Sequence, residues 1–214
     1  MVAEVRFGVQ TIDHIAIPVR DLEANQSFYL DVLGLQFKTT RRNPDGSPRQ
    51  TYVLAGENII GLHLPGVSAG ISPSAAPRIG IGVTAERFAE TLSKLRAANH
   101  AFRGPVEHGA GAPLVRSIYF DDIDGNHLEL CIRRVEPSSA CISHTVFETV
   151  NLKKSLTFYS EALGTAVPIS CGNEAVPILP EHLDRLHRQA AVRHVGMEAS
   201  LDQPAVGNLG QIFF

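Results

Sequence analysis

Residues 12–34 read IDHIAIPVRDLEANQSFYLDVLG, and residues 142–164 read ISHTVFETVNLKKSLTFYSEALG. Laid over each other without a gap, the two stretches share an Ile at the first position, a His at the third, a Phe-Tyr pair and a Leu-Gly end. Each reads as a strand followed by a helix that stops at glycine. The shared positions identify an internal repeat, so the sequence predicts a fold made of repeated modules that each open with a strand and a helix.

The predicted helices have recognisable ends. Asp21 and Asn151 stand just before them, and both residue types have side chains that accept hydrogen bonds from the free N–H groups of a first helical turn. Gly34 follows the first helix, at the position where glycine tolerates a left-handed backbone. Because the apolar residues between them recur at roughly helical spacing, this helix should bury one stripe.

Strand-like runs continue each module. After the first helix they cover residues 35–41, 49–55 and 57–64, and residues 65–76 form a linker rich in Pro, Gly and Ser. A second unit has a strand at 78–83, a helix at 85–98 and strands near 101–105, 115–121 and 126–133. Beyond residue 164 the third unit shows no clear three-strand pattern, only a helix at 181–193 and an apolar end, GQIFF.

Composition and charge exclude several classes of protein. Hydrophobic residues make up 44% of the 214 residues and charged residues 19%, which is typical of a globular protein. The net charge of -3 offers no basic face for nucleic acid, and no apolar run is as long as a membrane span. Three cysteines without CxxC spacing argue against a disulfide framework or a zinc ribbon, so we expect a cytoplasmic location.

Four of the predicted strands share one design. Successive strand residues face opposite sides, so each strand can be divided into two faces. In all four, one face is apolar, and the other combines small residues with His, Arg or Glu. The second faces consist of His14, Ala16 and Pro18; Ile59, Gly61 and His63; Arg78, Gly80 and Gly82; and His127, Glu129 and Cys131. We therefore expect a curved sheet that lines a cavity.

His14, His63 and Glu129 are the candidate metal ligands on these faces. Two imidazoles and one carboxylate leave open positions on a divalent ion, and they suit Fe, Mn, Zn or Ni. Each residue alone is more often a hydrogen-bonded or solvated residue than a ligand. The combination favours the metal, because a Glu between Leu128 and Leu130 needs a compensating partner if it is buried.

The same residues resemble the vicinal oxygen chelate superfamily of glyoxalases, extradiol dioxygenases, fosfomycin-resistance proteins and bleomycin-binding proteins. Residues 12–34 resemble its opening strand and helix, and SIYFDDIDGNHLEL at 117–130 resembles its closing hairpin with a metal-binding Glu. The resemblance implies ligand positions at His14, His63, Arg78 and Glu129. Arg78 departs from the pattern, because Arg cannot lose its proton to become a ligand. It is an anchor for a substrate oxygen or, equally well, a solvated strand end.

Other residues have weaker assignments. Tyr119 and His127 are the candidate general bases, and Ser117 shares a face with Tyr119 and is a candidate substrate contact. His108 lies in a Gly-rich loop and is more simply an exposed His. His144 repeats the position of His14, and we interpret it as a structural relic unless a partner chain supplies the missing ligands.

These observations predict an α+β protein of paired βαβββ modules that form a curved mixed sheet around a metal-lined cavity. The domain spans 8–136, and residues 140–214 are a partial or diverged third module. The expected function is a divalent-metal-dependent enzyme acting on a small oxygen-chelating molecule, by dioxygenase or by glyoxalase-type lyase or isomerase chemistry. The alternative is a metal-free protein that sequesters an antibiotic or toxin. An unfinished module leaves open sheet edges, so we expect a homodimer.

Overall fold

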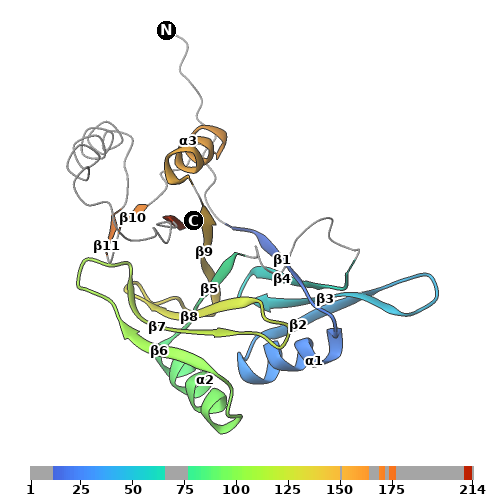
Figure 1. Cartoon of the computed structure of the whole chain (residues 1–214). Helices are drawn as coiled ribbons and strands as arrows, with labels where there is room; N and C mark the ends of the chain where they lie inside the picture. The colour runs from blue at the N-terminus through green and yellow to red at the C-terminus, as the bar shows by residue number, and fades with distance from the viewer. Residues whose placement is uncertain are drawn as a thin grey trace, which may run out of the picture. The chain divides into compact units, whose positions relative to one another are not determined.

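The computed structural model describes residues 12–65, 77–149, 151–163, 169–171, 174–176 and 210–213 (Figure 1). The chain divides into two compact units, Thr11–Phe147 and a unit that joins Met1–Gln10 to Glu148–Phe214. Within the described ranges, no helix has the length and apolar character needed to cross a membrane.

The first module of the larger unit is βαβββ, as the sequence predicts. Its elements are β1 (His14–Pro18), α1 (Leu22–Ser27), the π-helical turn η1 (Phe28–Val32), β2 (Gln36–Arg42), β3 (Pro48–Ala55) and β4 (Asn58–His63). The strands lie in the order β1-β4-β3-β2, with β1 parallel to β4 and the other pairs antiparallel. β1 is therefore an edge strand of this sheet.

The second module repeats this topology. It contains β5 (Arg78–Gly82), α2 (Ala85–Ala97), β6 (Phe102–Glu107), β7 (Leu114–Asp121) and β8 (His127–Arg133). The order is β5-β8-β7-β6, again with the first strand parallel to the last. Here the edge of the first strand is covered, because β9 (Cys141–Thr149) pairs with β5 in the antiparallel direction. The fold is thus the predicted α+β arrangement of mixed sheets.

The first helix is capped as expected. The Asp21 Oδ1 atom accepts hydrogen bonds from the N–H groups of Glu23 and Ala24, both at 3.0 Å. Gly34 ends the helical segment with φ +68°, in the left-handed region that glycine adopts without steric cost. The π-helical turn between them was not expected, since the apolar spacing indicates a continuous α-helix.

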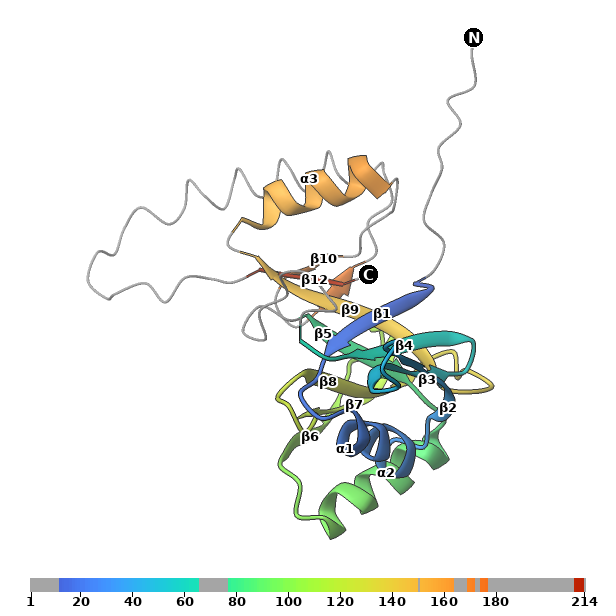
Figure 2. The same cartoon turned by 90° about the vertical axis from the view of Figure 1, so that its right-hand side faces the viewer.

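The apolar faces of both modules and their helices form one core. η1 and α2 lie side by side (Figures 1 and 2), and the Lys94 Nζ atom donates a hydrogen bond to the Asp31 carbonyl at 2.8 Å. Strands and helices of both modules contribute residues that are exposed by 2% or less, among them Ile17, Tyr29, Ile60, Leu62, Ile81, Phe88, Leu95, Ile118, Leu128 and Leu130. Burial of such side chains contributes about 1.5–3 kcal/mol each.

The smaller unit contains the elements of the third repeat. They are α3 (Leu152–Leu163), β10 (Ile169–Cys171), β11 (Glu174–Val176) and β12 (Gly210–Phe213). The Asn151 Oδ1 atom accepts a hydrogen bond from the Lys154 N–H, so the predicted cap is confirmed. The short strands β10 and β11 correct the sequence interpretation, which found no such pattern there. β10 pairs with both β11 and β12. The predicted helix at 181–193 lies outside the described residues.

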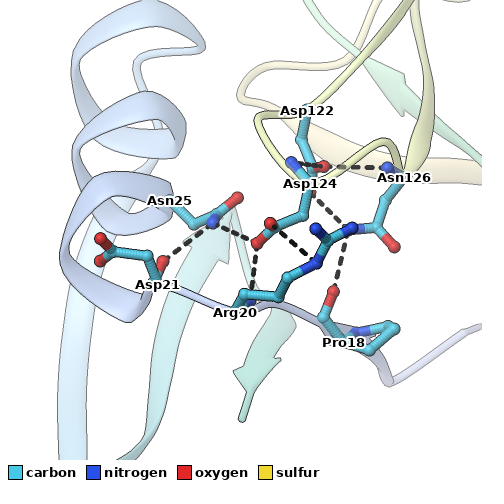
Figure 3. A network of polar contacts seen from close by, with 7 residues as sticks. All are labelled: Pro18, Arg20, Asp21, Asn25, Asp122, Asp124 and Asn126. Carbon is cyan, nitrogen blue, oxygen red and sulfur yellow. Dashed lines mark hydrogen bonds and ion pairs between the residues drawn. The ribbon is translucent and has the colours of Figure 1, made fainter. Parts of the chain in front are cut away.

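A buried polar network joins the two modules of the larger unit (Figure 3). The turn between β7 and β8 folds around Asp122, which accepts hydrogen bonds from the Asn126 side chain at 2.7 Å and from the Tyr29 hydroxyl at 3.1 Å. From the same turn, Asn126 donates to the Pro18 carbonyl at 3.0 Å, and Asp124 accepts a hydrogen bond from the Arg20 N–H at 2.7 Å. These bonds fix the β7–β8 hairpin against the junction between β1 and α1.

We expect Asp122→Ala to destabilise the protein by at least about 3 kcal/mol, because it leaves several buried donors without an acceptor. Asp121→Ala is the matched control, since Asp121 is the exposed neighbour and forms a surface ion pair with His127. Urea unfolding followed by circular dichroism measures both. Equal midpoints for the two variants would contradict the role assigned to this network.

Candidate functional site

Glu129 lies at the centre of a polar face formed by five strands. In the sheet register, Glu129 is opposite Gly80 of β5 on one side and Tyr119 of β7 on the other. His144 of β9 is opposite Gly80, and Arg103 of β6 is opposite Tyr119. Residues opposite each other project to the same side of a sheet, so these side chains share one face. The predicted division of β5 and β8 into an apolar and a polar face is therefore consistent with the structure.

The Glu129 carboxylate is buried and fully partnered. It is 2% exposed. Its oxygens accept hydrogen bonds from the Ser117 hydroxyl at 2.7 Å and from His144 Nε2 at 3.2 Å, and an Arg78 guanidinium nitrogen lies 3.9 Å away. Burial by itself raises the pKa of Glu129, but the hydrogen bonds and charges of its three partners outweigh burial and lower the pKa below its ordinary value. Glu129 is therefore a carboxylate anion at neutral pH.

Ser117 connects Glu129 to a loop histidine. His108 Nε2 lies 2.8 Å from the Ser117 oxygen. Because the single hydroxyl proton of Ser117 is donated to Glu129, His108 Nε2 must be the donor to Ser117, which fixes the proton of His108 on that nitrogen. Ser117 is 0% exposed. Its position suits it to orient Glu129 within the sheet.

Arg78 and Tyr119 are stacked beside the carboxylate. The guanidinium of Arg78 lies 5.2 Å from the centre of the Tyr119 ring, and that of Arg103 lies 4.7 Å from it. Both distances are within the range of cation–π attraction. Burial, followed by the charge of Glu129, raises the pKa of the Tyr119 phenol, so this group keeps its proton at neutral pH. It is better suited to donate a hydrogen bond than to act as a base.

His127 stands on the same face but at its rim. Its Nδ1 atom lies 2.6 Å from a carboxylate oxygen of Asp121, and both side chains are more than half exposed. The pair could exchange a proton with a molecule that reaches this edge of the sheet. Its role as a general base stays a prediction.

Among the described residues, His14, His63 and Glu129 do not form a three-residue cluster that could hold a metal ion. His14 begins β1 opposite Ile59, whereas His63 ends β4 opposite Pro18, so the two lie four residues apart along paired strands. At roughly 3.3 Å per residue this is about 13 Å. His14 is mostly exposed beside Asp13, and His63 contacts the Gln50 amide at 3.3 Å. Desolvation and nearby Arg49 and Arg41 lower the pKa of His63.

His144, which the sequence analysis interpreted as a structural relic, contacts Glu129. It is 7% exposed, and a Cβ atom added at Gly80 would overlap its ring. The repeat of His14 at this position was visible in the sequence. The pairing of β9 with β5, which brings His144 to Glu129, was not.

His144 and Glu129 could act as two neighbouring ligands of one divalent ion. Two donors at about 2.1 Å from an ion and at right angles lie about 3.0 Å apart, close to the 3.2 Å between His144 Nε2 and Glu129 Oε2. His144 would first lose the Nε2 proton, as its Nδ1 contact with Ser143 allows. Within the described ranges, no cluster of three or more His, Cys, Asp or Glu side chains could hold a metal ion. The described residues therefore offer an ion at most this pair of ligands.

Comparison with known families agrees with this architecture. Residues 11–130 match the model of the Glyoxalase/Bleomycin resistance protein/Dioxygenase superfamily. The chain belongs to this superfamily. The match covers both modules of the larger unit and includes Arg78, Ser117, Tyr119 and Glu129.

Individual proteins are similar to part of this chain. Virulence protein STM3117 of Salmonella typhimurium is 28% identical over 132 residues, which cover 59% of this chain and 86% of that protein. Its crystal structure has a TM-score of 0.46 at 26% identity and covers 58% and 98% of the two chains. A lactoylglutathione lyase from Agrobacterium tumefaciens has a TM-score of 0.46 at 20% identity and covers 58% and 94%.

We expect Gly80→Ala to destabilise the protein by about 1–3 kcal/mol, because the new methyl group overlaps the His144 ring and displaces it from Glu129. Gly82→Ala on the same strand is the control. Its added Cβ would meet its nearest neighbours at 3.1 Å, so a smaller effect is expected. Urea unfolding compares the two variants, and an unaffected Gly80→Ala protein would contradict the contact between His144 and β5.

Proposed function

We propose that this chain is an enzyme that binds a small, oxygen-bearing molecule over Glu129 and uses a divalent ion in glyoxalase-type or dioxygenase-type chemistry. The observation that carries the proposal is the buried Glu129 carboxylate, with His144 Nε2 at 3.2 Å and Arg78 at 3.9 Å. A charge buried to this degree is costly unless it has compensating partners, and a bound divalent ion would add one to those present. Membership of a superfamily that includes glyoxalases and dioxygenases supports the same conclusion.

Glu129 and His144 would hold the ion, which would supply Lewis-acid or dioxygen chemistry at the substrate's oxygens. Arg78 would bind a negatively charged substrate oxygen. Its stacking on Tyr119 limits its motion. The side chain is 22% exposed, so its N–H groups can donate hydrogen bonds to a bound substrate. Ser117 would fix the orientation of the Glu129 carboxylate through its 2.7 Å hydrogen bond. These roles need no rearrangement of the sheet.

Tyr119 and His127 would handle protons. The protonated phenol of Tyr119 stands across the sheet register from Glu129 and would donate a hydrogen bond to a substrate oxygen. His127, held by Asp121 at 2.6 Å, would accept or return a proton at the exposed rim. We place the reaction in the cytoplasm and expect the protein to be a homodimer.

A metal-free binding protein is the second candidate. The observation that favours it is Arg78, whose positive charge stands beside Glu129 in a position where the resemblance implies a metal ligand. Arg78 and His144 already compensate the carboxylate. In that case the face around Glu129 would sequester an anionic molecule without converting it.

Elemental mass spectrometry of the purified protein separates the two candidates. We expect near-stoichiometric metal in the wild type and its loss in Glu129→Gln and His144→Ala, because each variant removes one of two protein ligands. Phe37→Ala, an exposed β2 residue, is the control and should retain the metal. A wild type that takes up no Fe(II), Mn(II), Zn(II) or Ni(II) after anaerobic addition would overturn the enzyme proposal in favour of sequestration.

Arg78 is tested by the binding of small anions. With phosphonoacetate and lactate as anionic probes and catechol as a neutral one, we expect Arg78→Gln to weaken binding of the better anionic probe by at least about tenfold, the loss of a charge-assisted hydrogen bond. Arg116→Gln is the control, since Arg116 pairs with Glu107 on the surface. Isothermal titration calorimetry measures the affinities. Equal losses in both variants would show a general effect of charge and remove Arg78 from the site.

A further inference from the structure

Two arginines lie against one tyrosine ring on the face that carries Glu129. Tyr119 of β7 is opposite Glu129 of β8 on one side and opposite Arg103 of β6 on the other. The guanidinium carbons of Arg78 and Arg103 lie 5.2 Å and 4.7 Å from the centre of the Tyr119 ring, so they are no more than about 10 Å apart. Two positive charges at this separation repel each other, and an anion bound beside both would relieve the repulsion.

The two arginines differ in their acidic partners. Arg78 has a guanidinium nitrogen 3.9 Å from a Glu129 oxygen. Arg103 is exposed, and within the described ranges it stacks on the tyrosine ring but forms no ion pair. Arg116, on the neighbouring strand β7, is by contrast paired with Glu107. The N–H groups of Arg103 can therefore donate to a bound molecule.

The charges around Tyr119 do not balance. Glu129 offsets one of the two guanidinium charges, and the neighbouring carboxylate of Asp121 contacts His127 at 2.6 Å. One positive charge is left over, and the divalent ion proposed at Glu129 would add two more. A ligand with a single negative charge leaves part of this excess uncompensated, whereas a dianion compensates it more fully. This part of the face therefore favours a ligand with two negative charges.

We propose that the molecule bound over Glu129 is a small dianion such as a dicarboxylate, with one anionic group held by Arg78 and the other by Arg103. This rests on the anion-binding role proposed above for Arg78, and it applies to an enzyme and to a sequestering protein alike. Tyr119 limits the separation of the two guanidinium groups, because both stack on its ring. Arg103 is then the residue that selects dianions over monoanions.

The positions of the two guanidinium groups limit the size of such a ligand. Each guanidinium binds a carboxylate through N–H···O hydrogen bonds of about 2.8 Å, preferably two in parallel. Because the guanidinium carbons of Arg78 and Arg103 lie close to one ring, the two anionic groups of the ligand are separated by only a few carbon atoms. Malonate, succinate and glutarate cover this range of lengths and are suitable probes.

Paired probes test whether the site counts charges. Malonate, succinate and glutarate are each compared with the monoamide of the same acid, which has nearly the same shape and one negative charge fewer. We expect the wild type to bind the best dianion at least about tenfold more tightly than its monoamide, because only the dianion makes a charge-assisted hydrogen bond to each arginine. Isothermal titration calorimetry on the protein as purified measures the affinities.

Arg103→Gln should abolish the preference for the dianion and leave the affinity for the monoamide unchanged, because the monoamide can still bind to Arg78. Retained monoamide binding also shows that the variant is folded. Arg96→Gln is the matched control, since Arg96 is likewise exposed and stacks on an aromatic ring, that of Phe102 at 5.9 Å. Phe102 projects to the other side of β6 from Arg103, so this control should keep the preference.

Two results would overturn the proposal. One is a wild type that binds none of the three dianions more tightly than its monoamide, and the other is an equal loss in Arg103→Gln and Arg96→Gln, which would show a general effect of net charge. The metal proposal is read separately, from metal content. A metal-free protein that prefers dianions would support a dianion site in a sequestering protein, whereas a metal-bound protein without the preference would refute the dianion site alone.

Discussion

The buried carboxylate of Asp122 is the interaction on which the arrangement of the two modules depends. It accepts hydrogen bonds from the turn that carries it and from Tyr29 of the first module. Asn126, oriented by the same carboxylate, holds the end of β1 through the Pro18 carbonyl. The hairpin that carries Glu129 is thus tied to the strand that carries His14.

The two modules have the same topology but carry different side chains at equivalent positions of their last strands. The position occupied by Glu129 in the second module is Gly61 in the first, and there the ring of His63 fills the space. A buried charge needs partners, and the second module has recruited Arg78, Ser117 and His144 around its carboxylate. The first module has no such charge to compensate. In its place, the His63 ring lies beside Gly61 and contacts the Gln50 amide at 3.3 Å.

The sequence was sufficient where the cause of a structure is local. Asp21 and Asn151 predicted helix starts, and alternation along β5 and β8 predicted the two faces, because capping and side-chain direction depend on near neighbours. The pairing of distant strands could not be predicted in this way. Nothing local in ISHTVF indicates that it pairs with β5, so His144 was interpreted as a structural relic. His14 and His63 were grouped with Glu129, although His14 begins β1 and His63 ends the parallel strand β4. The register is a property of the assembled sheet.

Charge balance at Glu129 explains how one site can serve either candidate function. One carboxylate and one guanidinium cancel, so the pair alone has no net attraction for an ion of either sign. At 3.9 Å, however, the Arg78 guanidinium is not in close contact with Glu129. The guanidinium lies against the Tyr119 ring, and the Arg78 side chain is partly exposed. A divalent ion at Glu129 and His144 would compensate the carboxylate and release Arg78 to bind an anionic oxygen. Cation and anion would then bind more tightly together than apart, which makes Arg78 the residue that couples them.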